Sequence, residues 1–178
     1  MRIVSGKYKS RRFDVPKSFK SRPTTDFAKE NIFNVIANII DLEDATALDL
    51  FAGTGSISFE LVSRECKEVV SVEKDSAHYN FIKKVKAELK ADNLITIRMD
   101  AFKYIETSKL EFDFIFADPP YALTNLKDIP NLILSKGLLK PGGIFVMEHP
   151  KEYDFSALPY FSQRRVYGAV NFSIFIKK

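Results

Sequence analysis

The tetrapeptide Asp118-Pro119-Pro120-Tyr121 combines residue types that can hold a flat, amine-bearing ring. The Asp118 carboxylate and the Pro119 carbonyl are both acceptors, so together they can bind an exocyclic NH2 group. Proline fixes the backbone and offers no competing N–H, which stiffens the loop, and the Tyr121 ring offers a face for stacking a nucleobase. These four residues are therefore candidate catalytic residues. The alternative is a plain turn at a strand end, which Asp-Pro also favours.

A glycine-containing turn, 52–56, follows an apolar run at 46–51 and precedes a helical pattern at 57–64. Glycines at such a turn let the backbone approach a ligand, and the helix start supplies free N–H groups. Ser58 stands where a dinucleotide-binding turn has its third glycine, so a nicotinamide oxidoreductase is a distant alternative. Asp49 suits a ligand that carries an ammonium group, such as the methionine part of S-adenosylmethionine. The candidate cofactor-binding residues here are Asp49, Phe51, Ala52, Gly53 and Gly55.

Two further strand ends carry carboxylates. The apolar run at 68–73 ends in Glu73, which can accept hydrogen bonds from both ribose hydroxyls of an adenosine. The run at 94–99 is followed by Asp100 and Ala101, and Asp100 can accept from an adenine amine. Each residue has a simpler alternative, a solvated glutamate or a helix N-cap aspartate. Four strand ends that carry the expected groups in order nevertheless favour a cofactor site.

The elements that must position these groups alternate between strands and helices. Five apolar runs predict parallel strands, at 46–51, 68–73, 94–99, 112–117 and 144–148. A helix capped by Thr25 or Asp26 is expected before them, and a hairpin of 164–167 with 170–176 after them. Residues 2–4 and 12–15 suggest a small N-terminal β-hairpin. This order predicts an α/β fold in which helices cover both faces of a mostly parallel, seven-stranded sheet.

Positive charge gathers at the start of the chain. Residues 1–22 hold eight basic side chains and one acidic one, although the net charge of all 178 residues is only +4. Such a basic extension on a mildly acidic body suits a phosphate backbone; the alternative is a solvated segment that aids solubility. The candidate RNA-binding residues are Arg2, Lys7, Lys9, Arg11, Arg12 and Arg22.

Composition excludes several other classes. The hydrophobic fraction of 46% argues against disorder, and no apolar stretch approaches the roughly 20 residues that span a bilayer. One cysteine and two histidines provide neither an internal disulfide nor the ligands of a zinc cluster, so no metal is expected. The first residues lack the apolar core of a signal peptide, so we expect a cytoplasmic protein.

These motifs together resemble the class I S-adenosylmethionine-dependent methyltransferases. More narrowly, the chain is similar to the bacterial family that methylates the 2-amino group of a guanine in 16S ribosomal RNA. The resemblance covers nearly the whole chain and is carried by the segments 2–8, 22–25, 30–34, 48–55, 118–121, 148–150 and 167–168. Lys29, where the family more often has arginine, and Ser5, often glycine, depart from its pattern.

The resemblance implies a Rossmann-like methyltransferase domain over 1–178, with 1–22 as the basic extension and 23–178 as the catalytic core. It implies S-adenosylmethionine as cofactor, small-subunit ribosomal RNA or an assembling small subunit as partner, and a monomer. A guanine would be flipped out of its stack and held by Asp118, Pro119 and Tyr121. Methylation of an amine in DNA or protein, and a non-catalytic RNA-binding module, are the alternatives.

Overall fold

A seven-stranded sheet in the order β3-β2-β1-β4-β5-β7-β6 forms the centre of the molecule. A computed structural model describes residues 1–20 and 24–178. The strands are β1 (Thr46–Leu50), β2 (Glu68–Val72), β3 (Leu94–Ile97), β4 (Phe112–Ala117), β5 (Leu139–His149), β6 (Phe161–Tyr167) and β7 (Val170–Ile176). The first five pair in parallel, whereas β7 is antiparallel to both neighbours. The mostly parallel, seven-stranded α/β fold is therefore confirmed.

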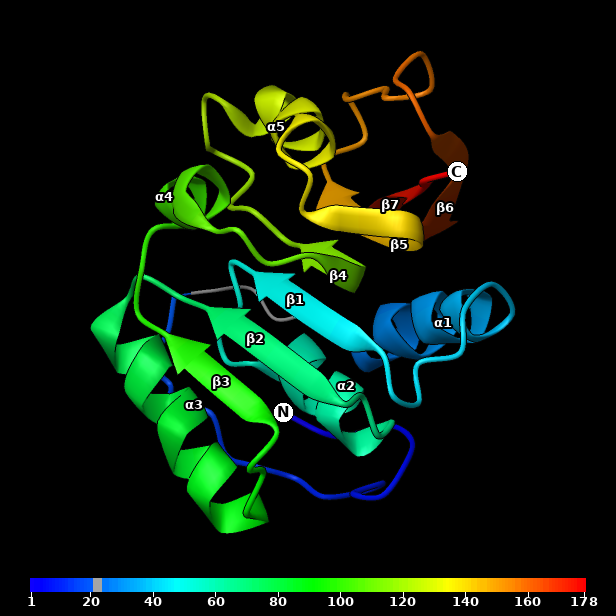
Figure 1. The fold of residues 1–178 in the computed structure, drawn as a ribbon. Coiled ribbons are helices and arrows are strands. Elements are labelled where there is room, and N and C mark those ends of the chain that lie inside the picture. The colour runs from blue at the N-terminus through cyan, green and yellow to red at the C-terminus, as the bar shows by residue number, and fades with distance from the viewer. Residues whose placement is uncertain (21–23) are drawn as a thin grey trace.

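Helices cover both faces of this sheet (Figure 1). They are α1 (Asp26–Ala37), α2 (Ser56–Ser63), α3 (Ser76–Leu89), α4 (Ala101–Thr107), the 3-10 turn η1 (Leu126–Asp128) and α5 (Ile129–Ser135). Apolar residues of α1, α2 and α3 pack into one core cluster, and those of α4 and α5 pack into another. Strand residues alternate between the two, since Phe114 and Phe116 face the first cluster and Ile115 and Ala117 the second.

The parallel register brings the carboxyl ends of β1, β2 and β4 to one edge of the sheet. Leu50 is paired with Val72 on one side and with Ala117 on the other. The residues that follow these three strands therefore begin the loops of one shared edge, where open α/β sheets bind their ligands. Thr25 caps α1 by accepting a hydrogen bond from the Ala28 N–H at 3.1 Å, as the sequence suggests.

The expected N-terminal hairpin is present but short: the N–H groups of Ile3, Ser10 and Phe13 donate to the carbonyls of Arg11, Ile3 and Met1, at 2.9–3.0 Å. Its two arms form a single antiparallel bridge, Arg2 with Arg12. The N–H groups of Val4 and Ser5 instead donate to the Glu60 carboxylate of α2, at 2.9 and 3.0 Å. Because a side chain of α2 engages these two donors, the hairpin of residues 1–13, here called the N-terminal strap, is tied to α2.

Candidate active site

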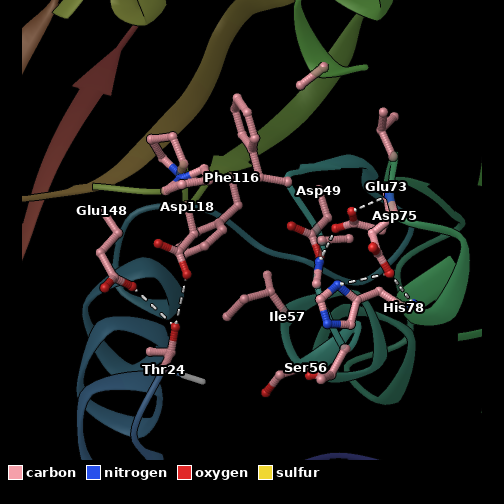
Figure 2. A pocket seen from close by; sticks show the side chains of 18 of the residues that line it. Thr24, Asp49, Ser56, Ile57, Glu73, Asp75, His78, Phe116, Asp118 and Glu148 are labelled. Atoms are coloured by element: carbon pink, nitrogen blue, oxygen red, sulfur yellow. Dashed lines mark hydrogen bonds and ion pairs between the residues drawn. The ribbon is translucent and has the colours of Figure 1, made fainter. Parts of the chain in front are cut away.

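A cavity of about 530 Å³ lies at the carboxyl edge of the sheet, between the start of α1 and the loops after β1, β2, β3 and β4. Its lining includes most of the predicted cofactor-binding residues and all four predicted catalytic residues: Asp49, Phe51, Ala52, Gly53, Glu73, Asp100, Ala101, Asp118, Pro119, Pro120 and Tyr121. Figure 2 shows Asp118 and Glu148 at one side of this cavity and Asp49 and Glu73 at the other. The structure thus gathers residues that lie far apart in the chain.

The turn after β1 is built from left-handed backbone. Phe51, Gly53 and Gly55 have φ angles of 59°, 57° and 80°, a region that glycine adopts without strain. A Cβ atom on Gly55 would lie 2.9 Å from the Phe59 ring and 3.0 Å from Ile82. Gly55 is therefore required both for its conformation and for the packing of α2 against α3. It shapes the cavity without lining it.

Glu73 ties this turn to the end of β2. One carboxylate oxygen accepts from the Gly53 N–H at 2.6 Å, and the other accepts from the Asp75 N–H at 2.8 Å. A carboxylate offers about four lone-pair sites, so two backbone bonds leave capacity for the hydroxyls of a ligand. Glu73 thus lines the cavity and also stabilises the glycine turn.

Asp49 is buried at the base of the cavity. Its Oδ2 atom accepts from the Ser58 N–H at 3.0 Å and from the Ser58 hydroxyl at 2.6 Å. Burial raises the pKa of this carboxyl to about 7, and the Glu73 charge adds to the rise. A positively charged ligand group beside Asp49 would favour the ionised form and lower that pKa again. Ser58, which the sequence motif marks only as a missing glycine, orients this carboxylate.

Asp100 is the N-cap of α4. Its Oδ1 atom accepts from the N–H groups of Phe102 and Lys103 at 2.9 and 3.3 Å, and Lys74 lies 3.9 Å from its Oδ2 atom. The capping alternative is therefore confirmed, and Asp100 also lines the cavity. The ring of Phe102 packs edge-on against the ring of Phe51, and the two ring centroids are 6.0 Å apart.

Asp118 and Glu148 face one another across a shared hydroxyl. The Thr24 Oγ1 atom lies 3.1 Å from Glu148 Oε2 and 3.4 Å from Asp118 Oδ2, as Figure 2 shows. Tyr121 donates its phenol proton to Glu148 Oε1 at 2.9 Å. The Asp118 side chain is accessible only in part, and its burial, together with the nearby Glu148 and Asp49 charges, raises its pKa well above the ordinary value. This corner can accept protons and hydrogen bonds from an amine.

Thr24 and Glu148 belong to the site although neither was among the residues predicted for it. Glu148 lies near the end of β5, and β5 is the parallel neighbour of β4. The sequence places Glu148 at one strand end and Asp118 at another, but it does not indicate that the two strands are adjacent. Thr24 precedes the cap of α1, so only tertiary packing brings it here.

Of the predicted RNA-binding residues, the five that the structure describes do not line the cavity. Arg2 pairs with Asp26 at the start of α1, at 2.9 Å. The Lys7 N–H donates at 2.7 Å to the carbonyl of Ser63, which is the last residue of α2. The length of α2, about 12 Å, thus separates this loop from the glycine turn. Lys9, Arg11 and Arg12 are exposed, and Arg22 lies outside the described residues.

Neither a metal-binding group nor a membrane-spanning helix is found in the parts of the chain that the structure describes. No group of three or more His, Cys, Asp or Glu side chains is arranged to hold a metal ion. None of the helices there combines the length and the apolar character needed to cross a membrane.

Comparisons with known proteins identify the family of this chain. The family model described as conserved hypothetical protein 95 matches residues 1–176. Ribosomal RNA small subunit methyltransferase D of Escherichia coli strain K12 is 31% identical over 159 residues, which cover 89% of this chain and 79% of that protein.

Two solved structures share the fold. A hypothetical protein of Thermus thermophilus superposes with a TM-score of 0.85 at 28% identity, over 98% of both chains. A 16S rRNA N2 G1207 methyltransferase of T. thermophilus, solved with AdoMet and guanosine, superposes with a TM-score of 0.72 at 20% identity. That superposition covers 90% of this chain and 45% of the other, and at this identity it establishes the fold alone.

Proposed function

The chain belongs to the ribosomal RNA small subunit methyltransferase D family, and from this premise we propose that it methylates the 2-amino group of a guanine in 16S ribosomal RNA with S-adenosylmethionine. It is an RNA methyltransferase by family. The observation that carries the choice of acceptor is the corner formed by Asp118, Pro119 and Tyr121, which offers acceptors and a stacking surface at the edge of the cavity.

The residues at the other side of the cavity fit the proposed cofactor. When bound, S-adenosylmethionine supplies a methyl group on a positively charged sulfur. Asp49 would hold its ammonium group, Glu73 its ribose hydroxyls, and Asp100 its adenine amine. Phe51 and Ala101 would wall the adenine ring. The open space above Gly53, where an added Cβ would meet nothing within 4 Å, leaves room for the ligand at the turn.

Asp118 and Pro119 would make the amine a better nucleophile. The lone pair of an exocyclic amine is delocalised into the ring, and hydrogen bonds from its two protons to the Asp118 carboxylate and the Pro119 carbonyl favour a tetrahedral nitrogen. The nitrogen would take up the methyl group that the cofactor supplies, and it would then release one of its two protons. The raised pKa of Asp118 suits it to accept that proton. Orientation supplies most of the rate enhancement.

The direct test is transfer of a labelled methyl group to hypomethylated small ribosomal subunits, followed by digestion to nucleosides. We expect labelled 2-methylguanosine. Label on DNA or protein instead would contradict the RNA assignment while keeping the cofactor. Cofactor binding without any transfer would contradict the enzyme assignment and favour the binding module.

Replacement of Glu73 by alanine should weaken cofactor binding by about 10- to 100-fold, because hydrogen bonds to a charged group contribute about 1.5–3 kcal/mol. The change also frees the N–H groups of Gly53 and Asp75. Isothermal titration with S-adenosylhomocysteine measures the effect. Glu88→Ala, an exposed glutamate on α3, is the matched control, and equal affinities of the two variants would contradict the role of Glu73.

The basic residues of 1–22 would contact the phosphate backbone away from the cavity. Replacement of Lys9 and Arg12 by alanine should lower RNA affinity and reduce the slope of log K against log salt by about 1 for each phosphate that the variant no longer neutralises. Lys136→Ala, exposed at the end of α5, should leave the slope unchanged. A slope that is the same in the wild type and both variants would exclude a role of Lys9 and Arg12 in phosphate binding.

The proposal extends to the assembly state and location of the protein. We expect residues 1–178 to act as one methyltransferase domain, with 1–22 as an RNA-binding extension, and to work as a monomer on ribosomal RNA or an assembling small subunit in the cytoplasm. Light scattering of the purified protein tests the monomer directly.

A further inference from the structure

Glu148 stands beside Asp118 because their strands are parallel neighbours. Ala117 pairs with Met147 at the end of the β4–β5 ladder, so the next residue on each strand is one of the two carboxylates. Glu148 is 6% exposed and lines the same cavity as Asp118. Figure 2 shows both side chains directed toward Thr24. This corner of the site therefore presents two carboxylates, and the proposed methyl transfer uses only the one on Asp118.

The surroundings of Glu148 fix its position. The Tyr121 hydroxyl donates to Oε1 at 2.9 Å, and the Thr24 hydroxyl lies 3.1 Å from Oε2. Thr24 also lies 3.4 Å from Asp118, but a hydroxyl has one proton and can donate it to one carboxylate at a time. Each carboxylate can accept about four hydrogen bonds. Both carboxylates line the cavity, so a ligand that enters it can present hydrogen-bond donors to them.

A guanine carries two such donors side by side on one edge. Its Watson–Crick edge presents the N1–H next to the exocyclic 2-amino group, and a base that is flipped into a pocket is read along this edge. Adenine differs at both points, because its N1 atom is an acceptor and its C2 atom carries no amine. In 2-aminopurine the 2-amino group is kept, but N1 is an acceptor. Two neighbouring carboxylates match the donor pair of guanine and repel the N1 lone pair of the other two bases.

We propose that Glu148 is a specificity-determining residue that accepts the N1–H of the target guanine while Asp118 accepts from its 2-amino group. This inference rests on the proposed function and adds the group that selects the base. It also assigns a role to the Tyr121–Glu148 hydrogen bond, which joins the ring that stacks on the base to the carboxylate that reads its edge. Stacking on Tyr121 and recognition of the base edge by Glu148 then both depend on this hydrogen bond.

The test reverses donor and acceptor on each side of the contact: the base loses its N1–H donor, and the protein gains a side-chain amide donor. An RNA that contains the methylated position is made once with guanine and once with 2-aminopurine there. We expect the wild type to prefer guanine by about 100-fold or more in kcat/KM, since a buried acceptor left facing another acceptor strongly disfavours the analogue. In Glu148→Gln, the side-chain amide can donate to N1 of 2-aminopurine, so the preference should fall by at least about 10-fold or reverse.

Binding gives a second readout that does not need turnover. The fluorescence of 2-aminopurine depends on its stacking partners, so it changes when the base moves from the RNA stack to the Tyr121 ring, and titration of this RNA follows that transfer. Glu148→Gln should bind the 2-aminopurine RNA more tightly than the wild type does. Glu152→Gln, an exposed glutamate four residues further along the chain, should behave as the wild type in both measurements.

The outcomes separate the inference from the proposed function. If the wild type does not methylate the guanine RNA, the proposed function fails. If it does, and Glu148→Gln shows the same base preference as the wild type, the role of Glu148 is overturned. Should Glu148→Gln fail to fold, the wild type alone decides: a preference for guanine below about 10-fold overturns the inference, and a larger one supports it.

Discussion

Replacement of Asp118 by alanine should reduce kcat by about 10³-fold or more while the affinity for S-adenosylhomocysteine changes less than about threefold. General base and hydrogen-bonding groups of this kind contribute about 10²–10⁴-fold to a rate. Asp118 lies at the end of the cavity that faces Thr24 and Glu148, on the opposite side from Glu73. Its loss should therefore affect the acceptor base and leave the cofactor-binding residues in place.

The pH dependence provides an independent signature of Asp118. Burial, and next the charges of Glu148 and Asp49, raise its pKa. The ionised form is the one that accepts from the amine, so kcat/KM of the wild type should fall as pH decreases through this raised pKa, well above the range of an ordinary aspartate. Asp118→Asn should remove that acidic limb, because asparagine does not titrate.

Asp128→Ala is the matched control for these measurements, since Asp128 is exposed and its side chain makes no capping hydrogen bond. Single-turnover rates with saturating cofactor, measured across the pH range, give both effects in one series. Normal turnover of Asp118→Ala would exclude Asp118 from the chemistry. A wild-type profile without an acidic limb would show that its ionisation is not required.

The site could be predicted where local sequence determines geometry. Apolar runs such as 112–117 must be buried strands, and residues at their carboxyl ends must share an edge. This rule predicts the positions of Asp49, Glu73 and Asp118. It does not predict their partners Ser58 and Thr24, because these reach the carboxylates from other segments and an isolated serine or threonine has no periodic signal.

Longer-range pairing explains the remaining differences. The sequence Lys140-Pro141-Gly142-Gly143 predicts a turn before a strand at 144–148, yet β5 includes it and extends from Leu139 to His149. The register between β4 and β5 shifts between Phe112 and Phe114, so an irregularity absorbs the proline and glycines. Proline is tolerated at such bulges. The N-terminal strap likewise depends on Glu60, whose role cannot be read from the strap itself.

Lys29 of α1 and Glu60 of α2 form the buried ion pair that holds this strap against the two helices. They are 1% and 0% exposed, and the Lys29 Nζ atom lies 3.5 Å from Glu60 Oε2. Lys29 also donates to the Ser56 hydroxyl at 3.0 Å and to the Arg2 carbonyl. Burial lowers the pKa of Lys29, although the Glu60 charge opposes that shift. Burying the two charges therefore costs folding free energy. Removing only one of them costs more, because the other charge stays buried without its partner.

Replacement of Lys29 by methionine should lower the free energy of unfolding by about 3 kcal/mol, the lower end of the range for breaking a buried pair. The lower end applies because Glu60 keeps Arg64 at 3.2 Å and the backbone N–H groups of Val4 and Ser5. For a chain of this size, that loss corresponds to a decrease in Tm of roughly 6–12 °C. Urea denaturation and calorimetry measure both quantities.

Two comparisons separate the loss of the pair from a general effect of the substitution. Lys84→Met removes an exposed lysine on α3 and should change Tm by less than about 2 °C, since surface substitutions usually stay within about 0.5 kcal/mol. Glu60→Met should destabilise more than Lys29→Met, because it strands the buried ammonium and two backbone donors together. In the double variant the effects should be less than additive, since the first change has already broken the shared interaction. Equal Tm values for Lys29→Met and Lys84→Met would mean that the pair does not hold the strap.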